Sequence, residues 1–528
     1  MRLDSFTDSD ITNTHGQIEM YRALYDGRHY EVFPRAKQLI QQGEIVGALN
    51  YGSELAADMK VPYIMANISK MIVDIPSMFI NRSLGQIKTT VERDYEEYDP
   101  DTDETDIEQI QERKEKQQKV IDDITFNTDL IKWNSMNLKQ WQIDGGIVAV
   151  PEIRNGKPRI CFKERTAYYE LEDGVTFQMR YVLEHGNKQY LHVHEEVEHE
   201  GYVEGSHTLY TYNSGAKLSV VEDEELIQQL INIDRPNRHY KLNNRTKTLF
   251  VYLPYEPTFM NKMGNSAIKG QEGKQDEVNW TLTRTAQVFE RNGRPRIAIP
   301  KDVFAEIQDR AEERYGDPNK IDHRDLEVTS IDDDGHKIEV LQIDTSRIGD
   351  IDYLKDIIKI MLMETQTSQK AVDLFSDETS YAQSGTAKFY DLFLSIIKAE
   401  KLRDEYVQFI QRAFENCLWL YSQVDGSIDI EQPDIKQSEM LPITSKERRE
   451  MNNTSYQSGT QSLEQTIRNN NPEKSDRWVA NELEKIEAEK TTTDSFSLLN
   501  GNQTAFNFND NRNADGQHVD DDGNVIED

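Results

Sequence analysis

The chain has 528 residues, of which 36% are hydrophobic, and its formal net charge at pH 7 is −34, from 95 acidic and 61 basic residues. This length predicts about three or four structural units, and no stretch approaches the ~20 apolar residues that a membrane span needs. Tight binding to nucleic acid depends on neutralising phosphates with lysine and arginine, so this protein either avoids DNA or handles it without holding it.

Helical periodicity runs through the first part of the chain. Residues 17–48 are expected to be helical, with a turn at Asp26-Gly27, and a second helix is expected at 61–81. Apolar residues at steps of three and four define that second helix: Ile64, Ile68, Met71, Ile75 and Phe79. The stretch 91–124 then carries 14 acidic and 5 basic residues, which predicts a solvated loop followed by an exposed helix.

Between Gly145 and Leu253 the pattern changes to short runs of strand-forming residues. Turn signals such as Asn155-Gly156, Asp173-Gly174 and Gly186-Asn187 separate these runs, which predicts antiparallel hairpins.

Histidines gather in this region, and His192 and His194 share one strand face. Alternate residues on a strand can chelate a metal. Four neighbouring glutamates favour an exposed, charged strand instead, so no metal site is predicted. The glutamates are Glu195, Glu196, Glu198 and Glu200.

The second half of the chain alternates helices with a small mixed segment. A helix is expected at 266–291 and another at 348–364. Between them, residues 292–347 carry strand-like runs beginning at Arg296, Leu326 and Lys337, and a short helix at about 304–314. A long helix is expected at 386–421, on the order of 54 Å. One apolar series defines it: Phe389, Phe393, Ile396, Leu402, Tyr406, Phe409, Ala413, Cys417 and Leu420.

The last hundred residues begin with a short strand at about 427–435. A helical region follows at 444–490, with capping-box spacings at Thr444…Glu447 and Ser462…Gln465. Residues 491–528 have a net charge of −7 and few core-forming side chains, so they are expected to be disordered. The fold class predicted from this order of elements is α+β.

The two cysteines match no metal or redox spacing. Cys417 lies in an apolar helical pattern, where a free thiol behaves as a small buried hydrophobe. Cys161 and Cys417 are interpreted as reduced and structural, which fits assembly in a cytoplasm. The first 16 residues are polar and acidic, without the apolar core of a signal peptide.

Four segments resemble the portal, or head-to-tail connector, proteins of tailed bacteriophages, of the siphovirus type. They are Met20-YRALYDGRH, Val61-PYIMANISKMIVDIPSMFINR, Gly264-NSAIKGQEGKQDEVNWTLTR and Ser384-GTAKFYDLFLSIIKAEKLRDEY. The resemblance is one of ordered segments over about residues 15–490, without the acidic insert 91–106 and the tail after 490. This chain has Gln383 before Ser384-Gly385, where relatives often have proline or leucine.

The resemblance implies a map of the chain. It comprises a wing (1–255, with a strand in 425–440), stem helices (256–291 and 348–366), a clip (292–347), a tunnel loop (367–385), a long kinked helix (386–424), a helical crown (441–490) and an acidic tail (491–528).

A portal protein implies a non-enzymatic ring of twelve copies at one capsid vertex, through which double-stranded DNA is packaged and ejected. The implied partners are the terminase large subunit, the major capsid and scaffolding proteins, and a head-completion or tail adaptor protein. The implied location is the virion, after assembly in the host cytoplasm. Neither a cofactor nor a metal is implied.

Basic residues concentrate at 262–301, where eight stand against four acidic ones. We expect some of them to meet DNA or the packaging motor; the alternative is a solvated helix face. The expected DNA-channel residues are Lys269, Lys274, Arg284, Lys370, Ser376, Thr379, Ser380 and Gln383. The expected motor- and adaptor-docking residues are Arg294, Arg296, Lys301, Arg310 and Arg314.

Signatures of catalysis are missing from the sequence. No phosphate-cradling Gly-x-x-x-x-Gly-Lys-Ser/Thr loop and no Gly-x-Ser-x-Gly elbow occurs. The acidic runs at Asp99–Asp103 and Asp332–Gly335 do not place a glycine at position six and a glutamate at position twelve, as a calcium loop requires. No catalytic residue is therefore predicted. Two alternatives stay open: another structural or adaptor protein of the phage head, and a metal-dependent nucleic-acid hydrolase that uses aspartate and glutamate.

Overall fold

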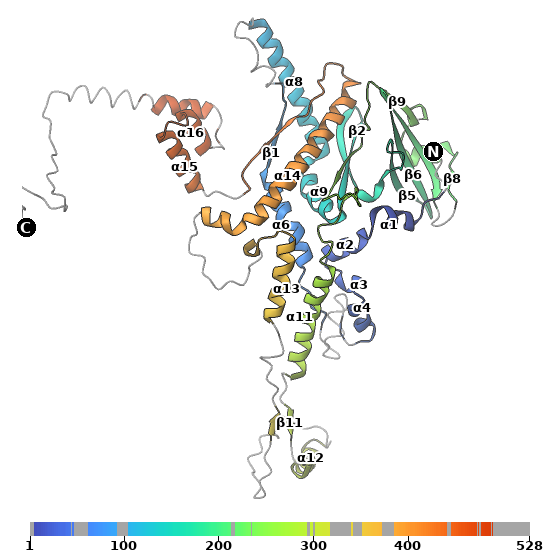
Figure 1. The fold of residues 1–528 in the computed structure, drawn as a ribbon, viewed down its shortest axis with the longest axis vertical. Helices are drawn as coiled ribbons and strands as arrows, with labels where there is room; N and C mark the ends of the chain where they lie inside the picture. Colours follow the sequence, from blue (N-terminus) through green and yellow to red (C-terminus); the bar gives the residue numbers. More distant parts are fainter. Residues whose placement is uncertain are drawn as a thin grey trace, which may run out of the picture. The chain divides into compact units, whose positions relative to one another are not determined.

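The computed structural model describes residues 5–43, 45–46, 62–91, 104–212, 217–233, 235–292, 296–298, 301–316, 339–341, 351–371, 385–440, 445–471, 474, 477–486 and 488. The chain divides into two compact units, Met1–Leu441 and Pro442–Asp528. Helices and antiparallel strands both contribute to the first unit (Figure 1), which confirms the α+β class.

The helices of the first unit are α1 (Asp8–His15), α2 (Ile18–Tyr25), α3 (His29–Val32), α4 (Pro34–Gln41), α6 (Ile68–Ser83), α8 (Glu104–Thr128), α9 (Leu130–Asp144), α10 (Glu224–Ile231), α11 (Glu272–Asn292), α12 (Lys301–Tyr315), α13 (Ile351–Glu364) and α14 (Gly385–Ser422). Short 3-10 turns lie at Arg165–Ala167, Arg235–Arg238 and Gln369–Ala371.

The strands are β1 (Leu84–Lys88), β2 (Gly146–Arg154), β3 (Lys157–Glu164), β4 (Tyr168–Glu170), β5 (Thr176–His185), β6 (Lys188–His199), β7 (Tyr202–Tyr212), β8 (Ser219–Val220), β9 (His239–Asn243), β10 (Val251–Pro254), β11 (Arg296–Ala298), β12 (Glu339–Leu341) and β13 (Asp434–Gln437). The pairings between these described strands are all antiparallel. Six strands form the main sheet, with β4-β5-β6-β7-β8 in order and β9 on β7, and three form a second sheet in the order β10-β2-β3.

The main core of the first unit surrounds α14. This helix packs on α6 and on the β10-β2-β3 sheet, and Figure 1 shows it crossing the middle of the unit. Trp141 of α9 and Tyr406 of α14 are fully buried there, with ring centroids 6.2 Å apart. Cys417 is also fully buried, which confirms its interpretation as a small core residue, and both cysteines are free.

The predicted hairpins are confirmed. Asn155-Gly156 joins β2 to β3, and Gly186-Asn187 joins β5 to β6. Asn155 and Gly156 both have positive φ, which such a two-residue turn requires.

The helix expected at 61–81 begins later, at Ile68. Its N-cap is Asn67, whose side chain accepts a hydrogen bond from the backbone N–H of Lys70 at 2.9 Å. The strand expected at 427–435 lies later in the chain, at Asp434–Gln437. This segment is β13, and it pairs with β1. The prediction that the helix within 91–124 is exposed is wrong in part. Val120, Ile121 and Ile124 of α8 are buried in the main core.

The prediction of an exposed, charged strand around His192 and His194 is also wrong, because both residues are part-buried. His192 and His194 on β6 and His207 on β7 form a stacked group, with His194 and His207 ring centroids 3.9 Å apart. A hydrogen bond of 2.6 Å joins His194 Nε2 to the hydroxyl of Tyr240. Tyr240 in turn donates to Glu196 Oε1 at 2.7 Å. Strand β9 and the segment at Thr248-Leu249 supply the partners that bury this face.

Stability should therefore fall at mildly acidic pH. Burial lowers the pKa of His192 to about 3 and that of His207 to about 4. The unfolded chain takes up protons near pH 6.5 while the folded chain does not, so stability is full above 6.5 and decreases below it. At pH 5.5 the loss is about 1 kcal/mol per histidine, measured by thermal melting at pH 7.5 and 5.5. The double variant His192→Gln/His207→Gln should show a smaller pH dependence, whereas His185→Asn, on the exposed end of β5, should match the wild type.

Helices α11 and α13 lie side by side (Figure 1). Val278 and Leu282 of α11 pack with Met361 and Leu362 of α13 and with Ile72 of α6. Strand β11 follows α11 and pairs with β12, which precedes α13. The segment between the two helices therefore begins and ends at a two-stranded sheet, with α12 inside it. The predicted strand near Leu326 lies outside the described residues.

The second unit contains α15 (Ser445–Gln457) and α16 (Leu463–Asn470), as predicted for this region. The hydroxyl of Ser462 accepts a hydrogen bond from the Gln465 backbone at 3.2 Å, which confirms this predicted cap. Asn452 of α15 donates to Asn470 of α16 at 2.7 Å. The acidic tail lies outside the described residues. Among the helices that the structure describes, none is both long and apolar enough to cross a bilayer.

Candidate functional site: DNA-contact and self-association surfaces

Two of the three predicted DNA-contact residues near α11 are engaged within the chain. Lys274 Nζ lies 2.7 Å from Glu364 Oε2 of α13, and Gln271 donates to the same oxygen at 2.9 Å. These hydrogen bonds lower the pKa of Glu364. Lys269 Nζ donates to Asn265 Oδ1 at 2.7 Å. Lys274 therefore joins α11 to α13, and Arg284 is exposed on α11.

The predicted tunnel loop begins from a fixed position on α14. Ser368 and Ser395 exchange two hydrogen bonds, in which each backbone N–H donates to the other hydroxyl, at 2.7 and 3.1 Å. Buried Lys398 donates to the Thr365 carbonyl at 2.8 Å, and burial lowers its pKa to about 8. Lys370 is exposed in the 3-10 turn that follows. The other predicted loop contacts lie outside the described residues: Ser376, Thr379, Ser380 and Gln383.

Three of the predicted docking residues lie in α12, which begins at Lys301. Arg310 and Arg314 are exposed on this helix, four residues apart and so on one face. Arg296 is in β11 and Lys301 begins α12, with the backbone alone described. Arg294 lies outside the described residues. The structure thus places Arg310 and Arg314 on one face of α12.

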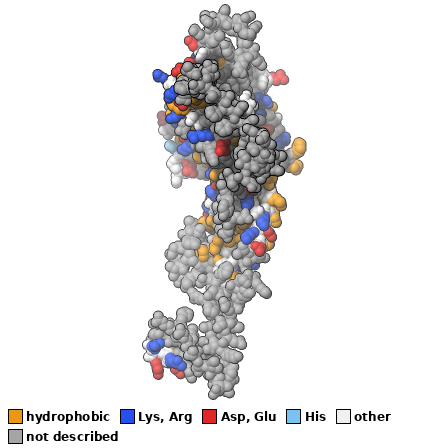
Figure 2. Space-filling view, turned by 90° about the vertical axis from the view of Figure 1, so that its left-hand side faces the viewer, with side chains coloured by type: hydrophobic (Ala, Val, Ile, Leu, Met, Phe, Trp, Pro, Cys, Tyr) orange, Lys and Arg blue, Asp and Glu red, His pale blue; other side chains and the backbone are white. Residues whose placement is uncertain are grey.

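An exposed apolar face at the start of α14 is the surface that sequence reasoning missed. Tyr390, Phe393, Leu394 and Ile397 recur at helical spacing and are 42–72% exposed; we name them the α14 stripe. The predicted apolar series combined two faces, because Phe393 is exposed while Ile396, Leu402 and Tyr406 are buried. Ile360 and Met363 of α13 are exposed as well. Figure 2 shows hydrophobic side chains reaching the surface among charged ones.

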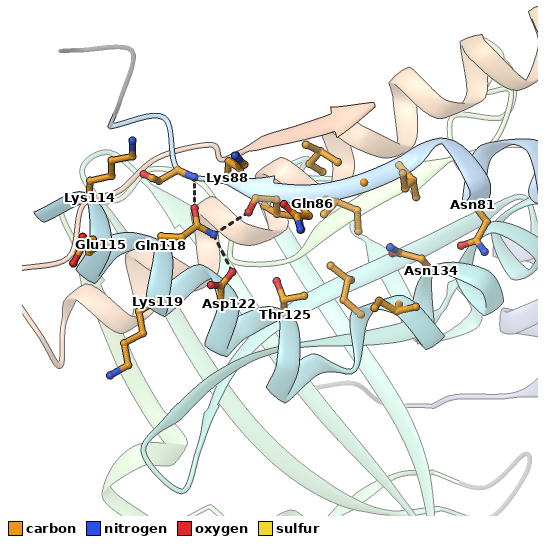
Figure 3. Close-up of a pocket in the computed structure, with 18 residues that line it drawn as sticks. Asn81, Gln86, Lys88, Lys114, Glu115, Gln118, Lys119, Asp122, Thr125 and Asn134 are labelled. Carbon is orange, nitrogen blue, oxygen red and sulfur yellow. Dashed lines mark hydrogen bonds between the residues drawn. The ribbon is translucent and has the colours of Figure 1, made fainter. Parts of the chain in front are cut away.

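A groove of about 920 Å³ lies beside β1, lined also by α8 and α9. Figure 3 shows Gln118 of α8 pointing to the strand. Its amide nitrogen donates to the Ile87 carbonyl at 3.0 Å, and its amide oxygen accepts from the Thr89 backbone at 3.0 Å. The side chain thus pairs with β1 as a neighbouring strand would. None of the residues predicted to contact DNA or docking partners lines this groove.

Metal ligands do not converge in the part of the chain that the structure describes: no group of three or more histidine, cysteine, aspartate or glutamate residues is placed to hold an ion. The stacked histidines are held by hydrogen bonds to each other and to Tyr240.

Comparison with known proteins gave matches among solved structures. No protein-family model and no curated protein matches the chain. It is similar to a chain from the virion of a native gene transfer agent particle, at 9% identity and a TM-score of 0.38, covering 75% of this chain and 88% of that chain. It is also similar to a chain from the neck of a native gene transfer agent particle, at 9% identity and a TM-score of 0.35, covering 80% and 92% respectively. Similarity at this level does not define a family, and none is assigned from it.

Proposed function

We propose that this protein is a portal subunit, which forms a ring at one capsid vertex and gives DNA a channel into and out of a phage head. The α14 stripe is the observation that carries the proposal. A helix whose opposite faces are buried core and exposed apolar surface needs a second surface to cover it. Copies of the same chain, arranged around a closed ring, supply that surface repeatedly.

The charge distribution fits a conduit. Deep neutralisation of phosphates would hold DNA in place, whereas a mostly acidic wall with a few cations allows it to slide. The chain carries a net charge of −34. Arg284 and Lys370 are exposed cations on the elements proposed to be the stem and the start of the tunnel loop. They are the described candidates for shallow, sequence-independent contacts with the DNA backbone.

The segment between α11 and α13 fits a docking module. It is enclosed by the β11-β12 pair and presents Arg310 and Arg314 on one face of α12. We propose that the terminase large subunit and later a tail adaptor bind there. Capsid and scaffolding proteins are proposed partners of the ring, which would assemble in the host cytoplasm and act in the virion. A different structural protein of the phage head is the second candidate, and no specific observation favours a hydrolase.

The size of the purified protein tests this function. Twelve chains of 61.3 kDa form a particle of roughly 0.7 MDa, and native mass spectrometry with negative-stain electron microscopy should show rings with a central hole. Leu394→Asp/Ile397→Asp should shift the distribution to smaller species, because it places charges in the α14 stripe. The matched control Val424→Asp, at an exposed apolar residue outside the stripe, should leave the particle size unchanged. A wild-type chain that stays monomeric and folded would contradict the proposal.

A further inference from the structure

Phe259 and Met260 form a fully exposed apolar tip between β10 and α11. They occupy the centre of a tight turn, in which the backbone N–H of Thr258 donates to the Asn261 carbonyl at 3.0 Å and the N–H of Asn261 donates to the Thr258 carbonyl at 3.1 Å. The two large side chains therefore point from a closed, hydrogen-bonded loop. We name Thr258–Asn261 the apolar turn.

The base of the apolar turn is fixed to the body of the unit. Asn261 Nδ2 donates to the Gly264 carbonyl at 2.6 Å, and Asn265 Nδ2 donates to the Glu256 carbonyl at 2.9 Å. Gly264 has a φ of +88°, and a Cβ at this position would lie 2.2 Å from the Gly145 carbonyl oxygen. The residue must therefore be glycine, and the tip is presented in one position without help from a partner.

Single exposed apolar side chains are common on protein surfaces, but an adjacent phenylalanine and methionine on a rigid tip are not explained in this way. Neither side chain contacts the α14 stripe of its own chain, because both are fully exposed. The chain thus carries a projecting apolar element and, separately, an exposed apolar helix face.

We propose that the apolar turn of one copy packs on the α14 stripe of the next copy. The inference rests on the proposed ring and names one of its contacts. A cyclic ring is built from heterologous contacts, so each copy must present two different surfaces that fit each other. The apolar turn and the α14 stripe meet this requirement in their chemistry, because both are apolar and exposed and they lie on different elements of the chain.

Disulfide trapping between co-expressed variants tests this contact. One chain carries Phe259→Cys and the other Leu394→Cys, so that a bond between these positions can form only between copies. Mild oxidation should give a covalent dimer on a non-reducing gel, at least five-fold more abundant than in the control co-expression of Phe259→Cys with Met78→Cys, an exposed position on α6. Cys417 is buried. Oxidised wild-type protein, which contains only the native Cys161 and Cys417, measures the background of covalent dimer.

A second variant separates this inference from the proposed function. Phe259→Ser/Met260→Ser should lower the fraction of chain in rings by at least ten-fold at limiting concentration, with an unchanged melting temperature for the monomer. Val424→Ser should assemble as the wild type does. Normal rings of the serine variant, together with no dimer above the control, would overturn the apolar-turn contact and leave the portal proposal standing. A wild-type chain that forms no ring would contradict both the apolar-turn contact and the portal proposal.

Discussion

Trp141→Ala is expected to lower the free energy of unfolding by about 3–5 kcal/mol, the range found when a large buried aromatic side chain is truncated. Trp141 is fully buried in the main core. Its ring meets Tyr255 edge-on at 5.4 Å and lies 6.2 Å from Tyr406 of α14. Truncation would leave a cavity where α9, α14 and the β10-β2-β3 sheet come together. Urea denaturation followed by far-UV circular dichroism measures the change.

Two variants control this prediction. Trp141→Phe keeps an aromatic ring and removes an indole N–H that has no hydrogen-bond partner among the described residues, so it should cost much less than alanine. Phe126→Ala removes a large ring that is mostly exposed on α8, and should change stability by less than about 0.5 kcal/mol. Equal losses for Trp141→Ala and Phe126→Ala would show that the core is not organised around Trp141.

The elements predicted correctly from the sequence are those with a local physical signal. Asn155-Gly156 specifies a hairpin because its residues tolerate positive φ, and the structure has that hairpin. Helix α14 was predicted because apolar residues recur along its whole length. Helix α9 was not predicted, because its buried residues include the polar Asn137, Gln142 and Asp144, which interrupt the apolar periodicity.

The predictions that were wrong depend on distant parts of the chain. The histidine strand is part-buried because Glu196, on the same strand, finds partners at Tyr240 and Leu249, more than 40 residues away. No local pattern reveals such a network. The α14 stripe was missed for a related reason: the start of the helix is apolar on more than one side, and the side that meets the core is decided by β2 and α6. The predicted DNA-contact and docking residues remain predictions.

Arg22→Met is expected to destabilise the protein by about 3–5 kcal/mol, because it leaves a buried charge without its partner. The side chain of Asp144 is fully buried and accepts two hydrogen bonds from the Arg22 guanidinium, at 2.9 and 2.6 Å. Asp144 ends helix α9, where the helix dipole disfavours a negative charge. Burial raises the pKa of Asp144, and Arg22 opposes that rise. Without Arg22 the carboxyl must be either buried as an ion or protonated.

The pH dependence of Arg22→Met separates loss of charge pairing from loss of packing. Without Arg22, the pKa of Asp144 in the folded protein should rise further above the unfolded value of 3.8. The folded variant then binds a proton that the unfolded chain has released, so the loss of stability grows as the pH rises above 3.8. The difference from the wild type should then be larger at pH 8 than at pH 5. Arg22→Met/Asp144→Leu should recover most of the lost stability, because it removes the stranded charge as well. Arg28→Met, whose partners Asp26 and Glu31 are exposed, should behave as the wild type at both pH values. A penalty for Arg22→Met that is the same at both pH values and is not relieved by Asp144→Leu would instead assign the role of Arg22 to its packing against α9.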